Sequence, residues 1–246
     1  MKQNLKIGIV GYGQMGREVE SVAISKGITI TDKFDIYQPL DENAKYTFDV
    51  AVEFTHPDSV IKNIEILAKM GKHIVIGTTG WYHKINEVRE IAEKYNIGIV
   101  WASNFSLGMN VFFKIVKFAA HLFNKLSDYD VLVNEIHHKL KKDYPSGTAI
   151  KIGNILLEEI KNKKEITNVP LLNNSYQINI SSTRGGCFPG THSVYFDSFV
   201  DTIEITHSAR NRIGFALGAV EAAILINRKK GFYEFIDLMD DIFKIL

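Results

Sequence analysis

One stretch in the middle of the sequence brings together side chains suited to acid–base chemistry and anion binding. Two histidines, His137 and His138, are followed by Lys141 and Lys142 and then by a Pro-Ser-Gly-Thr turn, Pro145–Thr148. Histidine titrates near neutral pH, and lysine supplies a point charge for an anion. A Ser-Gly-Thr sequence at a helix start offers backbone N–H groups and two hydroxyls to a carboxylate. The stretch therefore predicts a site that binds a small anion and transfers a proton.

The residues of this stretch leave three alternatives open. Adjacent side chains in an extended chain point to opposite faces, so His137 and His138 are expected to have different roles, and the sequence does not say which faces the pocket. Chemistry does not distinguish Lys141 from Lys142. A metal site on His137, His138 and Asp143 is the weaker interpretation, because successive histidines diverge and no further ligand stands at a suitable spacing.

A second pattern lies near the start of the sequence, between a predicted strand, Lys6–Val10, and a predicted helix, Gln14–Lys26. It matches G-x-G-x-x-G and reads Gly11-Tyr12-Gly13-Gln14-Met15-Gly16. The first glycine of such a pattern permits a tight turn, the second lets backbone approach a pyrophosphate, and the third allows close helix–strand packing. The start of the helix then presents N–H groups to the phosphates. We expect this turn to bind a nicotinamide dinucleotide.

A carboxylate follows the glycine turn at the spacing that dinucleotide-binding folds use. Asp32 lies about 20 residues further on, at the end of a second predicted strand, Ile28–Thr31, where it would accept a hydrogen bond from a ribose hydroxyl. Lys33 beside it could instead bind a 2′-phosphate. The sequence therefore leaves both NADH and NADPH open as the cofactor.

Three further segments follow predicted strands, at the ends where open α/β sheets bind ligands. They are Glu53-Phe54-Thr55 at the end of Val50–Thr55, Gly77-Thr78-Thr79-Gly80 after His73–Ile76, and Ala102-Ser103-Asn104-Phe105 at the end of Ile97–Ala102. Taken singly, each segment is as consistent with a loop as with a binding site.

The elements that must position these residues follow two different patterns. Up to about residue 107, the strands alternate with predicted helices, which is typical of βαβ units and a parallel sheet. After it come a helix, a strand, a second helix and three β-rich segments, whose Ser, Thr and charged alternation suggests a sheet with one solvent-exposed face. From about residue 212 the chain is helical again. The predicted elements are Pro57–Met70, Ile85–Tyr95, Val111–Lys125, Val131–His138, a helix from Ser146, Tyr176–Thr183, Ser193–Phe196, Thr202–His207, Phe215–Asn227 and Phe232–Ile245. We predict an α/β protein with a Rossmann-type parallel-sheet domain plus an α+β domain with a mixed sheet.

The composition limits the possible partners. The 246 residues include 29 Lys+Arg and 28 Asp+Glu, a net charge of +1, which gives no electrostatic attraction for nucleic acid or an anionic membrane surface. A single cysteine, Cys187, excludes an intrachain disulfide and a thiolate zinc cluster, and we expect it to be a small buried side chain. The N-terminus runs into a predicted strand without the apolar stretch of a signal peptide, and the longest apolar run, Ile213–Ile226, is too short to span a membrane. We expect a cytoplasmic protein.

The histidine-containing stretch, read as Glu135-x-His137-His138-x-x-Lys141-x-Asp143-x-Pro145-Ser146-Gly147-Thr148, resembles the signature of the dihydrodipicolinate reductase (4-hydroxy-tetrahydrodipicolinate reductase) family. The resemblance covers nearly the whole chain. The segments that follow the family's order are Gly77–Gly80, Asn104-Phe105-Ser106, Arg184-Gly185-Gly186, Gly190-x-His192 and Phe215-Ala216-x-Gly218-Ala219. The glycine turn departs from the family, because many members read G-x-x-G-R-M-G and Gln14 here replaces the basic residue.

The resemblance implies that NADH or NADPH reduces a small cyclic dicarboxylate in the diaminopimelate route to lysine. It implies His137 as the acid/base, Lys141 as the catalytic lysine, and His138, Ser146, Gly147 and Thr148 as contacts of a substrate carboxylate. The implied cofactor contacts are Gly11, Tyr12, Gly13, Gln14, Met15, Gly16, Asp32, Gly77, Thr78, Thr79, Ala102, Ser103, Asn104 and Phe105. The family also implies a homotetramer assembled through the second sheet, with residues 1–107 and 212–246 forming the dinucleotide-binding domain and 108–211 the substrate-binding and oligomerisation domain.

Two other hypotheses remain. A dehydrogenase of another small amino or keto acid would share the first domain but does not need a Pro-Ser-Gly-Thr turn after two histidines. A non-enzymatic redox sensor that binds a dinucleotide and DNA would need a basic helix-turn-helix segment, which this near-neutral chain does not show.

Overall fold

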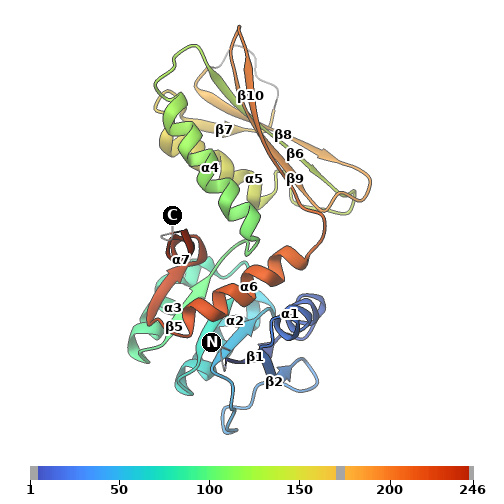
Figure 1. Ribbon diagram of the computed structural model, residues 1–246, viewed down its shortest axis with the longest axis vertical. Coiled ribbons are helices and arrows are strands. Elements are labelled where there is room, and N and C mark those ends of the chain that lie inside the picture. The colour runs from blue at the N-terminus through green and yellow to red at the C-terminus, as the bar shows by residue number, and fades with distance from the viewer. Residues whose placement is uncertain (1–4, 170–174, 244–246) are drawn as a thin grey trace. The chain divides into compact units, whose positions relative to one another are not determined.

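The computed structural model describes residues 5–169 and 175–243 of the chain. The chain divides into two compact units, Met1–Leu107 together with Arg212–Leu246, and Gly108–Asn211. The first unit is therefore discontinuous in sequence: the chain leaves it after residue 107 and returns at residue 212 (Figure 1).

The first unit is built on a six-stranded parallel sheet with the strand order β11-β5-β4-β3-β1-β2. All four residues of β3 are buried, as expected for a parallel strand that is covered on both faces. The carboxyl ends of these strands lie along one edge of the sheet. The strands are β1 (Lys6–Val10), β2 (Thr29–Phe34), β3 (Val50–Glu53), β4 (His73–Ile76), β5 (Gly98–Trp101) and β11 (Gly231–Glu234).

Helices cover this sheet, with α1 packed against α6 and α2 against α3 (Figure 1). Helix α2 begins where its sequence dictates, because the ring of His56 accepts the N–H of Asp58 and Pro57 occupies the first turn. The helices are α1 (Gln14–Ser25), α2 (Pro57–Lys69), α3 (Ile85–Lys94), α6 (Ile213–Ile226), α7 (Phe235–Phe243) and the short 3₁₀ helix η1 (Tyr82–Lys84).

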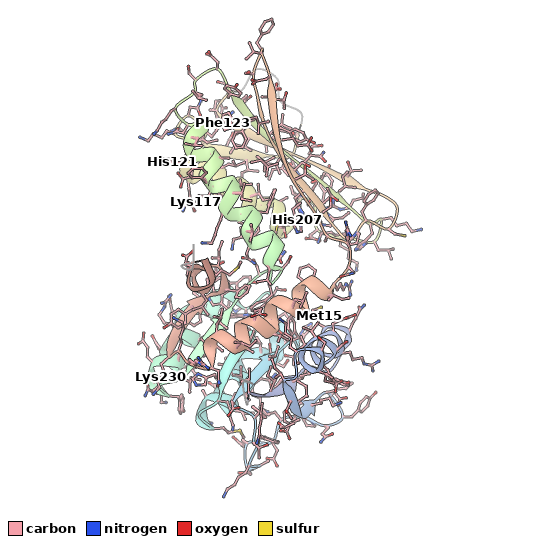
Figure 2. All side chains as sticks on the ribbon, viewed as in Figure 1. Met15, Lys117, His121, Phe123, His207 and Lys230 are labelled. Atoms are coloured by element: carbon pink, nitrogen blue, oxygen red, sulfur yellow. The ribbon has the colours of Figure 1, made fainter. Side chains whose placement is uncertain are left out.

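The second unit has a mixed five-stranded sheet with the order β10-β9-β6-β8-β7, in which β6 is parallel to β8 and antiparallel to β9. Its strands are β6 (Asp130–His137), β7 (Glu165–Thr167), β8 (Gln177–Arg184), β9 (Thr191–Asp197) and β10 (Thr202–Ser208). Helices α4 (Leu107–Phe123) and α5 (Gly147–Glu159) cover one face. Phe123 of α4 stacks on Phe196 of β9 at 4.3 Å between ring centroids, and Lys117 and His121 reach Glu159 of α5 (Figure 2).

The opposite face of this second sheet is polar. Ser193 and Thr206 share a hydrogen bond of 2.7 Å across β9 and β10, and the amide of Asn134 donates to Ser181 across β6 and β8 at 3.2 Å. The alternation of buried and more exposed residues along β6 separates the two faces. The fold class predicted from the sequence is confirmed, including the sheet with one polar face.

Several local predictions were wrong. The terminal segment predicted as one helix, Phe232–Ile245, instead forms the edge strand β11 before α7 begins, because Phe232 pairs with β5 and its ring stacks on Trp101. The three-residue strand β7 carries no periodic signal and was not predicted. Cys187 is exposed rather than buried. Among the described residues, no helix is long and apolar enough to cross a bilayer.

Candidate functional site

The glycine turn after β1 has the geometry that its three glycines require. Gly11 has a φ of +96°, and a Cβ there would overlap the carbonyl oxygen of Phe54. A Cβ on Gly16 would press against the carbonyl oxygen of Gly11, so this glycine lets α1 pack closely on the turn. Gly13 faces open space, and no side chain caps the first turn of α1. Backbone N–H groups are therefore presented for an anion, as a dinucleotide pyrophosphate requires.

A hollow of about 590 Å³ lies beside this turn, within the first unit. Its walls come from the turn, from the segment after β2 and from the segment after β3. The lining residues are Val10, Gly11, Tyr12, Gly13, Arg17, Phe34, Asp35, Ile36, Tyr37, Pro39, Leu40, Phe54, Thr55, His56, Ser59 and Asn63.

The acidic residue in this hollow is Asp35, not Asp32. The prediction that Asp32 ends the second strand is wrong, because β2 continues its pairing with β1 as far as the buried Phe34. Asp32 therefore lies within the strand and lines a separate depression. Asp35 is the first residue after β2, and one of its carboxylate oxygens accepts the N–H groups of Tyr37 (2.8 Å) and Gln38 (2.9 Å).

Two cations near the turn have different surroundings. The ammonium of Lys33 lies 2.7 Å from a carboxylate oxygen of Glu20 and 4.8 Å from the ring centroid of Tyr12. The Tyr12 hydroxyl also donates to Glu20. Arg17 lines the hollow, with its guanidinium 5.8 Å from the Tyr12 ring centroid. Lys33 is thus engaged by an internal carboxylate.

A second hollow of about 240 Å³ in the same unit brings together segments that are distant in sequence. It joins Met15 at the start of α1 (Figure 2) to the ends of β4 and β5. Arg212, where the chain re-enters this unit, also lines it and donates a hydrogen bond to Gln14. The lining residues are Met15, Phe54, Gly77, Ala102, Ser103, Asn104, Phe105, Arg212 and Phe215.

Buried polar groups hold the segments next to this second hollow. The indole N–H of the buried Trp81 donates to the carbonyl of Thr78 at 2.8 Å, whereas Thr79 is exposed. Glu53, fully buried at the end of β3, accepts from the N–H of Thr55 and the amide of Asn63, both at 3.3 Å. Burial raises the pKa of the Glu53 carboxyl, and these hydrogen bonds offset that effect only in part.

In the second unit, the two histidines differ in burial, and so do the two lysines. His137 ends β6 and is buried, whereas His138 is half-buried. Lys141 is half-buried, with its ammonium 2.8 Å from a carboxylate oxygen of Asp143, and Lys142 is exposed. Burial alone would raise the pKa of Asp143, but the Lys141 ammonium holds it below its ordinary value.

A buried carboxylate, Glu135, connects His137 to the start of α5. One oxygen of Glu135 accepts from the N–H of Ser146 and from the guanidinium of Arg184, both at 2.9 Å. The other lies 3.3 Å from Nδ1 of His137 and 3.5 Å from Nε2 of His192. Burial favours a raised pKa for Glu135, but the neighbouring rings of His137 and His192, together with hydrogen bonds from Ser146 and Arg184, hold it well below the ordinary range.

The start of α5 is arranged to accept an anion. Ser146 is the N-cap residue, and its hydroxyl accepts the N–H of Ala149 at 3.1 Å. Gly147 is exposed and faces open space, and Thr148 is half-buried. The Lys141 ammonium contacts the carboxylate of Asp143, and the backbone N–H of Gly147 also lowers the pKa of that carboxyl. An ammonium and a helix N-terminus therefore already share one carboxylate.

Sequence reasoning gave no role to five residues of these sites: Glu135, Arg184, His192, Asp35 and Arg212. Glu135 could have been found from its position two residues before His137, since alternate strand residues share a face. His192 and Arg184 lie in family segments but reach the site only through strand pairing, opposite Glu135 and His137 respectively. Asp35 and Arg212 carried no signal of their own.

A parallel-sheet unit with a glycine-turn hollow, and a second unit with a buried acid–base cluster at a helix start, define a two-domain dinucleotide-dependent oxidoreductase. The family model described as "Dihydrodipicolinate reductase, N-terminus" matches residues 5–105, and the one described as "Dihydrodipicolinate reductase, C-terminus" matches residues 108–239. The chain belongs to the dihydrodipicolinate reductase family.

Individual relatives agree with this assignment. A 4-hydroxy-tetrahydrodipicolinate reductase of Christiangramia forsetii is 38% identical, with 98% of this chain and 100% of the relative aligned. The enzyme of the same name from Archaeoglobus fulgidus is 34% identical over 96% of this chain and 100% of its own length. A dipicolinate-bound dihydrodipicolinate reductase from Paenisporosarcina sp. TG-14 has a similar fold, with a TM-score of 0.74 and 23% identity over 94% of this chain and 97% of that one.

Proposed function

We propose that the chain reduces 4-hydroxy-tetrahydrodipicolinate to tetrahydrodipicolinate in the diaminopimelate route to lysine. The chain is a nicotinamide-dependent reductase, and its family membership over both units carries the proposal. In the balanced reaction, the hydroxyl-bearing substrate first loses one water, which leaves a ring carbon conjugated with an imine. NAD(P)H would supply a hydride to that carbon, and a proton then completes the resulting enamine.

Protein side chains of the second unit carry the proton and bind the dicarboxylate in this proposal. His137 supplies the proton, a role worth roughly 10²–10⁴ in rate. Lys141 neutralises a substrate carboxylate and the charge that develops toward the ring nitrogen. Ser146, Gly147 and Thr148 hold a carboxylate at the start of α5, and His138 contacts the same ligand. The burial of His137 beside Glu135, and the half-buried position of Lys141, support this division.

The residues of the first unit fit a dinucleotide. The positive φ of Gly11 and the open face of Gly13 leave room for a pyrophosphate at the start of α1. We assign the turn (Gly11–Gly16) to that pyrophosphate, and the second hollow with Gly77–Thr79 and Ala102–Phe105 to the nicotinamide end. Asp35, in place of Asp32, accepts a hydrogen bond from the ribose.

We further propose a preference for NADH. The Asp35 carboxylate lies in the glycine-turn hollow and would repel a 2′-phosphate, while Lys33 is engaged by Glu20. Asp35→Asn should narrow the ratio of kcat/KM for NADH over NADPH by about tenfold, equivalent to about 1.4 kcal/mol. An unchanged ratio would contradict the assignment of Asp35.

A homotetramer assembled through the polar face of the second sheet is part of the proposal. That face carries the partly exposed Leu132, on the side opposite α4 and α5. Sedimentation of the wild type and of Leu132→Arg tests this assembly: a monomeric wild type would contradict it. The cytoplasmic location stays a prediction from the sequence.

The decisive experiment follows the loss of NADH absorbance with substrate made by the preceding synthase. His137→Gln should lower kcat by about 10²–10⁴, and Lys141→Ala should lower kcat and raise KM. Thr148→Val should mainly raise KM for the dicarboxylate. Lys142→Ala is the matched control, because this lysine is exposed. If His137→Gln and Lys141→Ala both keep wild-type turnover, the proposed roles are wrong.

A further inference from the structure

The carboxylate of Glu135 has a position that the proposed reaction does not yet use. It is fully buried, lies on β6 two residues before His137, and shares the inner face of the sheet with that histidine. Register brings His192 of β9 opposite Glu135 and Arg184 of β8 opposite His137. The Glu135 carboxylate therefore lies among side chains from three strands, β6, β8 and β9.

We propose that Glu135 is a positioning residue that acts through His137: it holds the imidazole with Nδ1–H toward the carboxylate and stabilises the protonated ring that gives up its proton from Nε2. The inference rests on the proposed role of His137. Nδ1 of His137 lies 3.3 Å from one oxygen of Glu135, which leaves Nε2 for the reaction.

Gly190 supports this orientation from the other side of the ring. It lies just before β9, and a Cβ there would stand 2.9 Å from Nε2 of His137. The absence of a side chain at this position leaves the reacting edge of the imidazole uncovered. Carboxylate and glycine together therefore determine which nitrogen of His137 faces outward.

The second oxygen of Glu135 links this histidine to the anion site. It accepts the N–H of Ser146, the N-cap residue of α5, and the guanidinium of Arg184. The hydroxyl of Ser146 in turn lies 3.3 Å from Nε2 of His192. A single side chain thus fixes the relative positions of the proton donor and the carboxylate-binding helix start.

The charges around Glu135 are consistent with this role. Arg184 from β8 neutralises the carboxylate, and Lys141 in the loop between β6 and α5 is paired with Asp143. Burial lowers the pKa of His192, so that its ring stays neutral near pH 7. The Glu135, His137 and His192 donor atoms lie within 4.8 Å of one another, a spacing that a metal ion could also use. The guanidinium at 2.9 Å from the same carboxylate opposes a second cation there.

The test is the pH profile of kcat/KM for Glu135→Gln. A protonated His137 is needed in the free enzyme, so activity falls as pH rises. Loss of the carboxylate destabilises the charged ring, and the falling limb should move to lower pH by about one unit or more. We expect kcat to fall about 10- to 100-fold, the loss typical of groups that orient a metal-binding histidine through its other ring nitrogen. Glu158→Gln, the same change at an exposed position on α5, should leave both kcat and the pH of the falling limb unchanged.

A double variant separates positioning from simple structural damage. If Glu135 acts through His137, adding Glu135→Gln to His137→Gln should change kcat by no more than about twofold. Multiplicative losses, or a loss that is equal at every pH, would overturn the inference. Glu135→Asp, which keeps the charge, should retain more of the wild-type limb position, and it replaces Glu135→Gln if that variant does not fold. A fully active His137→Gln would instead refute the proposed function itself.

Discussion

Replacement of Ser146 by alanine should destabilise the second unit measurably. The Ser146 side chain is almost fully buried, and its hydroxyl accepts the N–H of Ala149, a residue with no exposed surface. Loss of an N-cap hydroxyl typically costs about 0.5–2 kcal/mol. Because no water can reach the buried N–H of Ala149, we expect the upper end, about 2 kcal/mol. For a chain of this size each kcal/mol lowers Tm by about 2–4 °C, so the fall should be about 4–8 °C.

Thermal unfolding followed by circular dichroism at pH 7 measures this fall. Ser127→Ala is the matched control, since Ser127 is exposed in a turn of the same unit and should change stability by less than about 0.5 kcal/mol. Ser146→Thr keeps an accepting oxygen and should recover most of the stability. A Tm of Ser146→Ala within about 1 °C of the wild type would refute the capping argument. KM for the dicarboxylate should rise in Ser146→Ala and recover in Ser146→Thr.

Three further predictions concern buried or paired polar groups. As pH rises above 4.5, the free energy of unfolding of Glu53→Gln should increase relative to that of the wild type. The reason is that the Glu53 carboxyl ionises in the unfolded chain there, whereas in the folded protein its raised pKa keeps it protonated. Parallel plots of Tm against pH for the two proteins would contradict this. Trp81→Phe leaves the carbonyl of Thr78 without its donor and should cost about 1–3 kcal/mol while raising KM for the cofactor, as measured by denaturant titration and kinetics. Asp143→Asn should lower KM for the dicarboxylate, because a neutral amide competes less well for Lys141; a higher KM would show that Asp143 orients that lysine instead.

Local patterns predicted much of the fold because each depends on neighbouring residues. The strands Lys6–Val10 and His73–Ile76 have the predicted bounds, since each is a short apolar run that ends at a glycine turn or loop. β11 could not be predicted in this way. Four residues at a sheet edge have no period of their own, and they become a strand only because β5 lies beside them.

The candidate site shows the same limit. Asp32 was identified by counting residues along the chain from the glycine turn. The residue that lines the hollow depends instead on where β2 stops pairing with β1, and because pairing continues to Phe34, Asp35 lines the hollow. Likewise, strand alternation predicts that Glu135 and His137 share a face. The partner Arg184 comes from 49 residues further along the chain, so its contact depends on register rather than sequence spacing.

The net charge of the anion site includes the carboxylate of Asp143 as well as the nearby lysines and histidines. In sequence, the lysines and histidines around residue 140 indicate a cluster of positive charge. In the structure, Asp143 already contacts Lys141, and the backbone N–H of Gly147 lowers the pKa of its carboxyl; these are the two kinds of group that we assign to a substrate carboxylate. Binding therefore exchanges one carboxylate for another, so affinity reflects the difference between two similar interactions. A dicarboxylate has an advantage in this exchange, because its second carboxylate gains contacts that Asp143 cannot make.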